Sequence, residues 1–319
     1  MNLKKISVVI PCYRVKNHIL AVIEGIGQEV STIYVIDDFC PEFSGDHVGI
    51  NCVDRRVIVL RNNFNLGVGG SVMVGYKRAL KDGADVIVKI DGDGQMDPSL
   101  LMRFASPIIS GVADYCKGNR FYDLEGLNSM PKVRLLGNAG LSFIAKFSTG
   151  YWNLFDPTNG YTAISREVAS RIPYEKISKR YFFETDILFR LNLLRAVAVD
   201  IPMTSIYSNE VSNLRIKKIF FEFLYKNFRN YLKRIFYNYY LRDMSVASIE
   251  LPLGICLFGF GLIYGLAGWW HSSLSGSSTP VGTIMLSSVT ILTGIQFLLA
   301  FINYDIGYVP TKPISKLDY

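Results

Sequence analysis

Val86–Gln95 reads Val-Ile-Val-Lys-Ile-Asp-Gly-Asp-Gly-Gln and decides the fold of this 319-residue chain. Its first five residues are mostly apolar and β-branched, which predicts a buried strand. Asp91 and Asp93 follow directly, and a glycine comes after each of them. Carboxylates at the carboxyl end of a strand in an open α/β sheet lie where such sheets bind ligands. Oxygen ligands without His or Cys suit Mg²⁺ or Mn²⁺ and a phosphate-bearing substrate.

The Asp-Gly-Asp-Gly run has two other interpretations. It is equally consistent with a plain turn after a strand, because Asp and Gly are common turn residues. It also resembles the start of an EF-hand calcium loop, which requires Gly at its sixth position and Glu at its twelfth. Met96 and Met102 occupy those positions here, so the EF-hand is excluded. The rest of the chain decides between a ligand site and a turn.

Strand-like and helix-like stretches alternate in the part of the chain before Asp91. We expect strands at Ile6–Ile10, Thr32–Ile36, Arg56–Leu60 and Asp85–Ile90, and helices at His18–Gln28 and Gly67–Leu80. Pro11 is expected to end the first strand. This alternation predicts a mostly parallel, Rossmann-like α/β sheet with helices on both faces. Each strand that ends in a polar cluster then brings that cluster to the same edge of the sheet.

Four polar clusters follow in order: Pro11-Cys12-Tyr13, Ile36-Asp37-Asp38, Asn65–Gly70 and Asp91–Gln95. Each alone is weak, because an aspartate after a strand is usually solvated and a glycine pair can simply cap a helix. In this combination they resemble the family-2 glycosyltransferases of GT-A fold. The resemblance implies that Asp91 and Asp93 hold a divalent metal on a sugar-nucleotide diphosphate. It also implies a donor nucleotide site formed by Pro11, Tyr13, Ile36, Asp38, Asp91, Gly92 and Asp93.

A second group of residues narrows the resemblance to dolichyl-phosphate-mannose synthase and its bacterial polyprenyl-phosphate glycosyltransferase relatives. The group is Gln95, Gly118-Asn119-Arg120, Arg134 and Asn138, the last two on a helix-like stretch. The resemblance implies that Gln95 is a third metal ligand. It also implies that Arg120, Arg134 and Asn138 bind the acceptor phosphate. For each arginine taken alone, a surface ion pair is the alternative.

Two later stretches concern the surroundings of the sugar. Asp156–Tyr161 reads as a turn into a short strand, and the resemblance places it at the sugar pocket. Phe182–Asp186 is expected to open a helix with Thr185 as its N-cap. Glu184 and Asp186 are two residues apart and do not share a helix face, which leaves open whether either one contacts substrate.

The sequence departs from the family pattern in two places. Arg14 and Val15 follow the Pro-x-Tyr turn where the family has Asn-Glu, so one nucleotide contact is in doubt. The mannose synthases also carry basic residues in the loop after the strand at Val197–Ile201, and this loop closes over the donor. Here Pro202–Leu214 contains no Lys or Arg. Either this loop closes differently or the donor is not a GDP-sugar.

The charge of the chain is concentrated in one arm. The sequence has 34 basic and 27 acidic residues, a net charge of +7. Leu214–Arg242 holds eight basic residues and one acid, Glu222, so the remainder is neutral. This distribution argues against a nucleic-acid-binding protein, whose charge would form a patch on the fold. Aromatic and apolar residues recur at steps of three and four within the arm, which predicts a helix in a membrane interface. A surface helix packed on the core is the alternative.

Leu251–Trp270 and Val281–Ile302 are apolar, uncharged and about 20 residues long, which is enough to span a bilayer as helices. The linker His271–Pro280 has no Lys, Arg, Asp or Glu, whereas the basic arm precedes the pair and Lys312 and Lys316 follow it. The positive-inside rule then places the catalytic domain and both termini in the cytoplasm. Burial of both segments in a soluble core is the alternative. The resemblance implies a bacterial inner membrane.

These features predict four parts of the chain. Residues 1–213 form a GT-A domain, 214–249 amphipathic interface helices, 250–303 two transmembrane helices, and 304–319 a cytoplasmic tail. The five cysteines are scattered and lack metal-site spacing, which fits a reducing cytosol without structural disulfides or zinc.

The predicted reaction is transfer of a sugar, with inversion, from a UDP- or GDP-sugar to the phosphate of a membrane polyprenol. The predicted catalytic residues are Asp91, Asp93, Arg120 and Arg134, with Mg²⁺ or Mn²⁺ as cofactor. One alternative is a membrane-bound transferase that adds a sugar to a lipid-linked glycan. Another is a non-catalytic membrane anchor that binds nucleotide. The expected partners are the nucleotide-sugar, the polyprenyl phosphate and the bilayer, and a homo-oligomer is left open.

Overall fold

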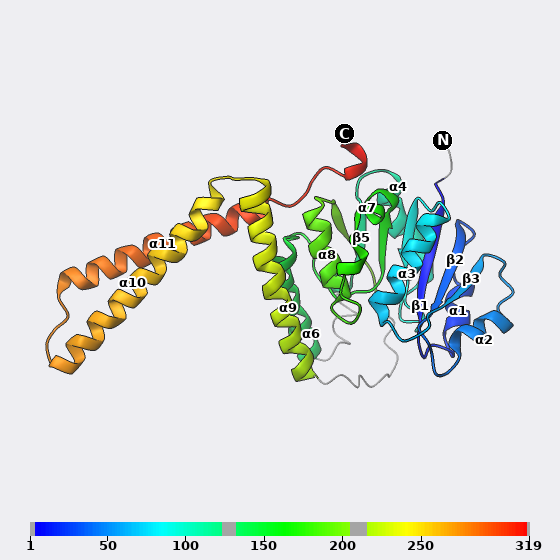
Figure 1. The fold of residues 1–319 in the computed structure, drawn as a ribbon, viewed down its shortest axis with the longest axis horizontal. Helices are drawn as coiled ribbons and strands as arrows, with labels where there is room; N and C mark the ends of the chain where they lie inside the picture. Colours follow the sequence, from blue (N-terminus) through cyan, green and yellow to red (C-terminus); the bar gives the residue numbers. More distant parts are fainter. Residues whose placement is uncertain (1–3, 123–131, 205–215, 318–319) are drawn as a thin grey trace. The chain divides into compact units, whose positions relative to one another are not determined.

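The structure is a computed structural model that describes residues 4–122, 132–204 and 216–317, with the side chains of all but 132–134 and 216–220. The chain divides into two compact units. Unit 1 comprises Met1–Leu232 and Val309–Tyr319, and unit 2 comprises Lys233–Tyr308. Unit 1 carries the sheet and unit 2 the two longest helices, and each is described by itself below (Figure 1).

Unit 1 is built on a seven-stranded sheet in the order β3-β2-β1-β4-β6-β5-β7. Four of its six strand pairings are parallel: β1 with β2, β1 with β4, β2 with β3, and β5 with β7. Only β6 runs antiparallel, between β4 and β5. The strands are β1 Ile6–Cys12, β2 Val30–Asp37, β3 Val57–Arg61, β4 Val86–Lys89, β5 Tyr115–Asn119, β6 Thr162–Ser165 and β7 Ala198–Pro202. The mostly parallel sheet predicted from the sequence is confirmed.

Helices cover both faces of this sheet. The helices of unit 1 are α1 Ile19–Glu24, α2 Ser44–Asn51, α3 Val68–Lys81, α4 Leu101–Ile109, α6 Lys132–Thr149, α7 Arg166–Arg171 and α8 Phe183–Leu193, together with most of α9 Ile216–Phe236. One core packs α1, α2 and α4 against strand residues such as Val8 and Val88. The other packs α3, α7 and α8 against the alternate residues, such as Val9 and Ile87. Strands buried on both faces explain the continuous apolar runs in the sequence.

Two local expectations were wrong. Strand β1 continues through Pro11 to Cys12. Its pairing with β4 ends at Val9, and beyond that point it pairs with β2 alone, so the missing N–H of proline is tolerated. Helix α8 begins at Phe183 with Phe182 as its N-cap, so Thr185 lies inside the helix instead of capping it.

Helix α9 has one buried and one exposed face within unit 1. On the buried face, the Asn230 side chain donates to Asp186 of α8 at 3.0 Å, and Asn227 receives a hydrogen bond from Ser148 of α6. The exposed apolar and aromatic side chains are Phe221, Leu224, Tyr225, Phe228 and Leu232. Their steps of three and four place them on one side of the helix. The amphipathic pattern read from the sequence is therefore present, and its exposed face has the composition of an interfacial helix.

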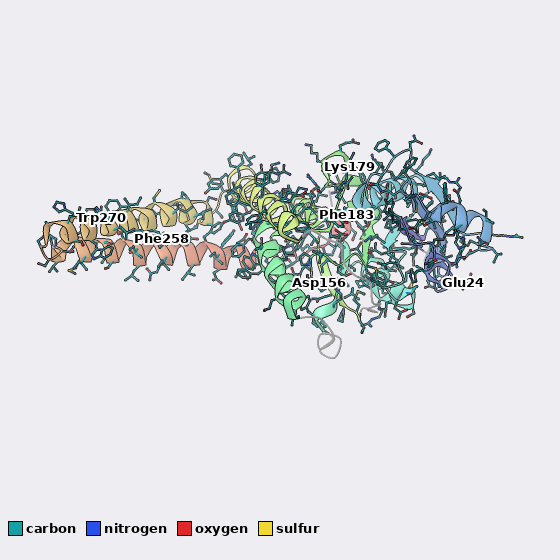
Figure 2. The ribbon with its side chains drawn as sticks, turned by 90° about the horizontal axis from the view of Figure 1, so that it is seen from below. Glu24, Asp156, Lys179, Phe183, Phe258 and Trp270 are labelled. Atoms are coloured by element: carbon teal, nitrogen blue, oxygen red, sulfur yellow. The ribbon has the colours of Figure 1, made fainter. Side chains whose placement is uncertain are left out.

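Unit 2 contains α10 (Ala247–Ser275) and α11 (Val281–Gly307), which are long and apolar enough to cross a membrane. They pack through small residues: a Cβ on Gly294 would lie 2.5 Å from the backbone nitrogen of Phe258, and Ser287 Oγ donates to the Gly261 carbonyl at 2.8 Å. Trp270 lies near the closed end of this hairpin and Phe258 nearer its middle (Figure 2). The helix pair thus has the close seam typical of membrane helices.

A buried charge pair lies at the other end of the hairpin. Arg234 Nη1 is 2.6 Å from Asp305 Oδ1, and the Tyr239 hydroxyl donates to the same carboxylate at 2.5 Å. Arg234 is only 1% exposed. Arg234 belongs to the basic arm expected from the sequence, but its guanidinium pairs with Asp305 inside unit 2 and is not displayed on the surface.

The segment after α11 belongs to unit 1 again. Ile314 is buried in the core that contains α3, α7 and α8, and its backbone N–H donates to the Asp114 carboxylate at 2.9 Å. Asp114 also accepts the backbone N–H of Val197 at the start of the β7 region. The chain therefore leaves the sheet unit before unit 2 and returns to it afterwards (Figure 1).

Candidate active site

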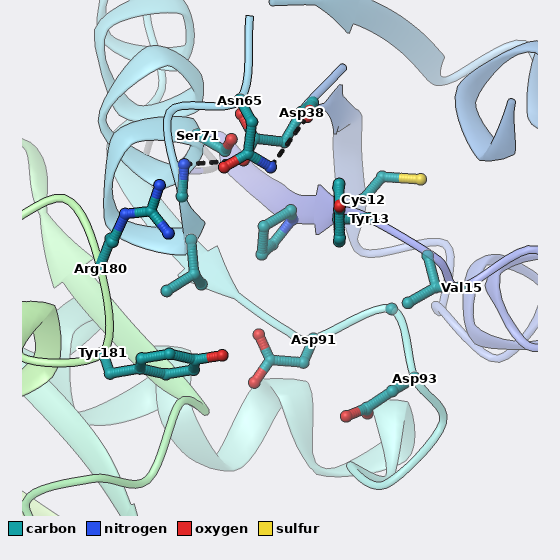
Figure 3. A pocket seen from close by; sticks show the side chains of 14 residues that line it. Cys12, Tyr13, Val15, Asp38, Asn65, Ser71, Asp91, Asp93, Arg180 and Tyr181 are labelled. Carbon is teal, nitrogen blue, oxygen red and sulfur yellow. Dashed lines mark hydrogen bonds between the residues drawn. The ribbon is translucent and has the colours of Figure 1, made fainter. Parts of the chain in front are cut away.

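A pocket of about 440 Å³ opens at the carboxyl ends of β1 and β4 (Figure 3). The strand order reverses between these two strands, and such a switch point is where open α/β sheets bind ligands. The lining residues come from five separate segments: Pro11, Cys12, Tyr13 and Val15; Asp38; Asn65, Gly67, Val68 and Ser71; Asp91, Gly92 and Asp93; and Arg180 and Tyr181. The four sequence clusters therefore meet at one place.

Asp91 and Asp93 both line this pocket, directly after β4. Asp93 Oδ1 accepts the backbone N–H of Gln95 at 3.0 Å, which closes the turn, and Gly94 has the positive φ that the turn requires. Gln95 is not among the lining residues. The role of Gln95 as a third metal ligand stays a prediction. The interaction that the structure shows is the hydrogen bond from the Gln95 backbone N–H to Asp93.

Lys89 lies behind Asp91 and was missed in the sequence analysis. Its Nζ is 2.7 Å from Asp91 Oδ1 and 3.8 Å from Glu184 Oε1, and the lysine side chain is 1% exposed. Burial lowers its pKa, but the charges of Asp91 and Glu184 raise it further, so the net pKa lies above the usual value and the lysine stays protonated. The available signal was a lone lysine inside an otherwise apolar strand, since a buried charge must be paired.

Glu184 completes this charged group from the first turn of α8. Burial raises the pKa of Glu184 to about 7, Lys89 lowers it in part, and the nearby Asp91 raises it. Asp186, two residues later, points elsewhere: it accepts hydrogen bonds from the Ser178 backbone and from Asn230. Of the two carboxylates left open by the sequence, Glu184 is thus the one near the pocket residue Asp91, and Asp186 has a structural role.

Asp38 is held within the structure by three donors. Its carboxylate accepts the backbone N–H groups of Leu66 at 2.7 Å and Gly67 at 2.8 Å, and the side-chain amide of Asn62 at 2.9 Å. It therefore fixes the glycine-rich turn at the pocket wall. The side chain of Ile36 is buried in the core beside α3 and is not among the lining residues, so its contact with the nucleotide stays a prediction.

The glycines of that turn allow another segment of the chain to approach. A Cβ on Gly67 would lie 2.6 Å from the Lys179 carbonyl oxygen, and one on Gly69 would lie 2.6 Å from that of Ser178. The Gly70 N–H also donates to the Lys179 carbonyl at 3.2 Å. Glycine is required here so that two backbones can touch. This contact carries Arg180 and Tyr181 to the rim of the pocket, which the sequence did not indicate.

Of the three residues predicted to bind an acceptor phosphate, Arg120 and Asn138 do not line this pocket. The Arg120 guanidinium makes a two-pronged contact with Asp156, with Nε to Oδ2 at 2.7 Å and Nη2 to Oδ1 at 2.6 Å. Asp156 is fully buried; burial raises its pKa, but the hydrogen bonds and charge of Arg120 leave the pKa below its usual value. The ion pair that the sequence offered as an alternative is present, although it is buried.

Asn138 and Arg134 both belong to α6. Asn138 is half-buried, and its carbonyl accepts the hydroxyl of Ser142, which in turn accepts the backbone N–H of Asp156. The side chain of Arg134 lies outside the described residues. Helix α6 is therefore linked to the Arg120–Asp156 pair through Ser142, and the acceptor-phosphate assignment stays a prediction.

The two pocket carboxylates fit a divalent cation bound together with a phosphate ligand. Mg²⁺ is commonly held by one or two carboxylates and the oxygens of substrate phosphates. Among the described residues, no group of three His, Cys, Asp or Glu side chains could hold a metal by itself. A cation held by these two carboxylates together with phosphate oxygens of a ligand fits a diphosphate-bearing substrate.

Comparison with known proteins agrees with this geometry. The family model for glycosyl transferase family 2 matches residues 7–172. A UDP-N-acetylglucosamine–dolichyl-phosphate N-acetylglucosaminyltransferase of Methanococcus voltae is 31% identical over 48% of this chain and 61% of that protein. An undecaprenyl-phosphate mannosyltransferase of Micrococcus luteus is 31% identical over 54% of this chain and 71% of that protein.

The fold is also found among solved structures. Glucosyl-3-phosphoglycerate synthase from Mycobacterium tuberculosis, in complex with Mn²⁺ and UDP-glucose, matches with a TM-score of 0.52 at 17% identity. The match covers 72% of this chain and 79% of that one. At this identity it shows the fold alone, which is GT-A.

Proposed function

The chain belongs to glycosyltransferase family 2, and from this we propose that it transfers a sugar from a nucleotide-sugar to the phosphate of a membrane polyprenol. The anomeric carbon is inverted in a single displacement. The bond from that carbon to the donor phosphate breaks, a new bond forms to the acceptor phosphate, and a nucleoside diphosphate leaves. The two relatives act on different sugars by their names, so the sugar is not assigned.

One observation carries this proposal: a single chain joins the Asp91–Asp93 pocket to two apolar helices long enough to cross a membrane. A pocket at a sheet switch point that presents two carboxylates suits a nucleoside diphosphate with a divalent cation. A membrane anchor is of use to a transferase whose acceptor is a lipid. The names of the relatives, which include dolichyl and undecaprenyl phosphate, support the same acceptor class.

Asp91 and Asp93 would hold Mg²⁺ or Mn²⁺ in this pocket. When bound, the cation neutralises charge on the departing nucleoside diphosphate. Lys89 supports Asp91 from inside the sheet by pairing with Oδ1. The glycine turn, fixed by Asp38, and the segment before Phe183, which contacts it, form another part of the pocket wall. Pro11 and Tyr13 would contact the base and ribose from the end of β1, where they line the pocket.

The acceptor needs positioning more than activation, because a phosphate oxygen is already anionic at neutral pH. We assign this task to Arg120, Arg134 and Asn138. Planar guanidinium groups suit phosphate and hold it in line for attack. The contact with Asp156 fixes the orientation of Arg120, so its guanidinium is preorganised before any acceptor arrives.

Chain connectivity supports a membrane arrangement with two spans. Residues on both sides of unit 2 belong to unit 1, so the chain must cross the membrane an even number of times between them. Two spans, α10 and α11, satisfy this requirement. With the positive-inside rule, unit 1 lies in the cytoplasm and the linker after Ser275 on the far side. The four-part division of the chain remains a prediction. The bacterial inner membrane also remains a prediction, because one of the two relatives comes from an archaeon and the other from a bacterium.

Lipid-product analysis tests the proposal. The purified full chain in nanodiscs is incubated with undecaprenyl phosphate or dolichyl phosphate, Mn²⁺, and a panel of radiolabelled UDP- and GDP-sugars. We expect label in an organic-soluble product with at least one donor, and none with Asp93→Asn, which keeps the shape of the side chain. Product formation only on a preformed lipid-linked glycan would contradict the assigned acceptor.

A further inference from the structure

Arg180 is a cation on the rim of the pocket whose guanidinium has no hydrogen-bond or ion-pair partner among the described residues. It differs in this from five other arginines of unit 1. Arg56, Arg61, Arg78, Arg120 and Arg190 each pair with an aspartate. In Figure 3 the Arg180 side chain faces the pocket from the side of the glycine-rich turn, and the hydroxyl of Tyr181 is directed toward Asp91. An unpaired cation held in a pocket is suited to an anion brought by a ligand.

The segment that carries Arg180 is fixed by its backbone. The Arg180 carbonyl accepts the Phe183 N–H at 2.8 Å, and the preceding Lys179 carbonyl accepts the Gly70 N–H at 3.2 Å. The Ser178 N–H donates to Asp186 at 2.8 Å. These three contacts, on the consecutive residues Ser178, Lys179 and Arg180, fix the backbone at Arg180 before a ligand arrives. Such preorganisation lowers the entropy lost when the ligand binds.

The charges of the pocket explain why a cation is needed there. Its lining includes three carboxylates, from Asp38, Asp91 and Asp93. Lys89 is buried behind Asp91 and is not among the lining residues. A diphosphate entering this pocket would meet mostly negative charge, and one divalent cation would neutralise only part of the total. A guanidinium on the rim supplies the charge that is otherwise lacking, and it suits phosphate geometry.

Other candidates for this role can be set aside. Arg14 follows Tyr13 in the sequence, but it is not among the lining residues, and its Nε lies 4.0 Å from Glu42. The segment Pro202–Leu214 contains no Lys or Arg in the sequence, so it cannot bring a cation over the donor. Arg180 is thus the one basic residue among those that line the pocket in the described part of the chain.

We propose that Arg180 binds the diphosphate of the nucleotide-sugar donor and stabilises the nucleoside diphosphate as it leaves. This inference rests on the proposed function. As the bond between the anomeric carbon and the phosphate oxygen breaks, its electron pair stays on that oxygen, and Arg180 holds the resulting negative charge. In this proposal the cation that binds the donor comes from the fixed segment before α8 and not from the loop after β7.

Nucleotide binding to the full chain in nanodiscs tests the inference by calorimetry with Mn²⁺ present. The probes are uridine, UMP and UDP, and guanosine, GMP and GDP. Arg180→Ala should weaken binding of the preferred diphosphate about ten- to a hundredfold, because charge-assisted hydrogen bonds to phosphate are lost. Nucleoside binding should stay unchanged, and Arg180→Lys should regain part of the affinity. Lys179→Ala, on the same segment but outside the pocket lining, should bind like the wild type.

The outcomes separate this inference from the proposed function. If the wild type binds a diphosphate and Arg180→Ala binds it equally well, the inference is overturned and the function stands. If the wild type binds no nucleotide, both fail. Steady-state kinetics form a second arm: the acceptor KM should be unchanged in Arg180→Ala. A raised acceptor KM with intact diphosphate affinity would assign Arg180 to the acceptor phosphate, against the proposal.

Discussion

At the scale of single residues, the two aspartates after β4 differ in a way that the sequence conceals. Both line the pocket, and either could hold a cation. Asp91 is also the partner of a buried lysine, with Lys89 Nζ 2.7 Å from its carboxylate, whereas Asp93 closes a turn through the backbone of Gln95. Asp93 is therefore expected to be dispensable for folding but Asp91 is not, because removing Asp91 would leave the buried charge of Lys89 without its nearest partner.

Isosteric substitution separates the two roles. Asp93→Asn should abolish transfer while changing the free energy of unfolding by less than about 0.5 kcal/mol. Asp91→Asn should abolish transfer and also destabilise the protein by up to about 3 kcal/mol, with Glu184 limiting the loss by remaining near Lys89. Activity assays and thermal unfolding in detergent check both variants. Equal unfolding temperatures for the two variants would show that the Lys89–Asp91 ion pair does not stabilise the fold.

Loss of activity in an Arg120 variant has two causes that must be separated: loss of stability and loss of the proposed contact with the acceptor phosphate. Asp156 is fully buried beneath its guanidinium, so Arg120→Ala should destabilise the protein by about 3–5 kcal/mol by leaving that carboxylate unpaired. The double variant Arg120→Met with Asp156→Asn removes both charges and should recover much of the stability but none of the activity. Unfolding of Arg120→Ala at the wild-type temperature would contradict the buried pair.

The residues that the sequence placed correctly are those that follow a strand directly. Tyr13, Asp38 and Asp91 come to one edge because strand ends of a parallel sheet must do so. The side chain of Ile36 is not among the pocket residues, because alternation along β2 sends it into the core. Arg180 reaches the same pocket only through contacts between backbones distant in the chain, which leave no periodic or spacing signal.

At the scale of elements, the helices of unit 2 show what composition alone can and cannot predict. Their apolar length predicted two helices, and α10 and α11 are both present, each extending beyond the apolar stretch. Which glycines form the seam could not be read from the sequence, because α10 is rich in glycine throughout. The structure distinguishes them: a Cβ on Gly294 would collide with the backbone of Phe258, whereas one on Gly259 would meet nothing within 4 Å.

A matched pair of glycine variants tests this seam. Gly294→Val should force α10 and α11 apart and destabilise the hairpin by about 1–3 kcal/mol through overpacking. Gly259→Val adds the same side chain on a surface that faces away from α11 and should be tolerated. Thermal unfolding followed by circular dichroism in detergent compares them. If both variants unfold alike, the close packing at Gly294 is absent.

At the scale of the whole molecule, the chain returns to the sheet unit after the hairpin. The tail was expected to be a short cytoplasmic segment, and nothing in its sequence predicts docking, because a single buried Ile314 gives no pattern. The backbone N–H groups of Ile314 and Val197 both donate to the carboxylate of Asp114. Burial raises the pKa of Asp114. The tail therefore both fills a core and supplies a donor to a buried acid.

Altering the tail should weaken unit 1. Ile314→Ala should reduce its free energy of unfolding by about 2–4 kcal/mol, as expected for a buried isoleucine, and truncation after Tyr308 should do so more strongly. Lys312→Ala, an exposed neighbour, should have no effect. Thermal unfolding monitored with and without UDP or GDP provides the measurement. An unchanged midpoint after truncation would show that the tail does not stabilise the fold.

The central claim is that a sugar alone, without its donor phosphate, passes to the phosphate of a polyprenol. A donor labelled with ¹⁴C in the sugar and ³²P in the β-phosphate tests it most directly, with the full chain, Mn²⁺ and a polyprenyl phosphate. The account predicts that ¹⁴C enters the lipid fraction while all ³²P is recovered in the released nucleoside diphosphate. Both labels moving together into the lipid would show transfer of a sugar phosphate, and would contradict the account.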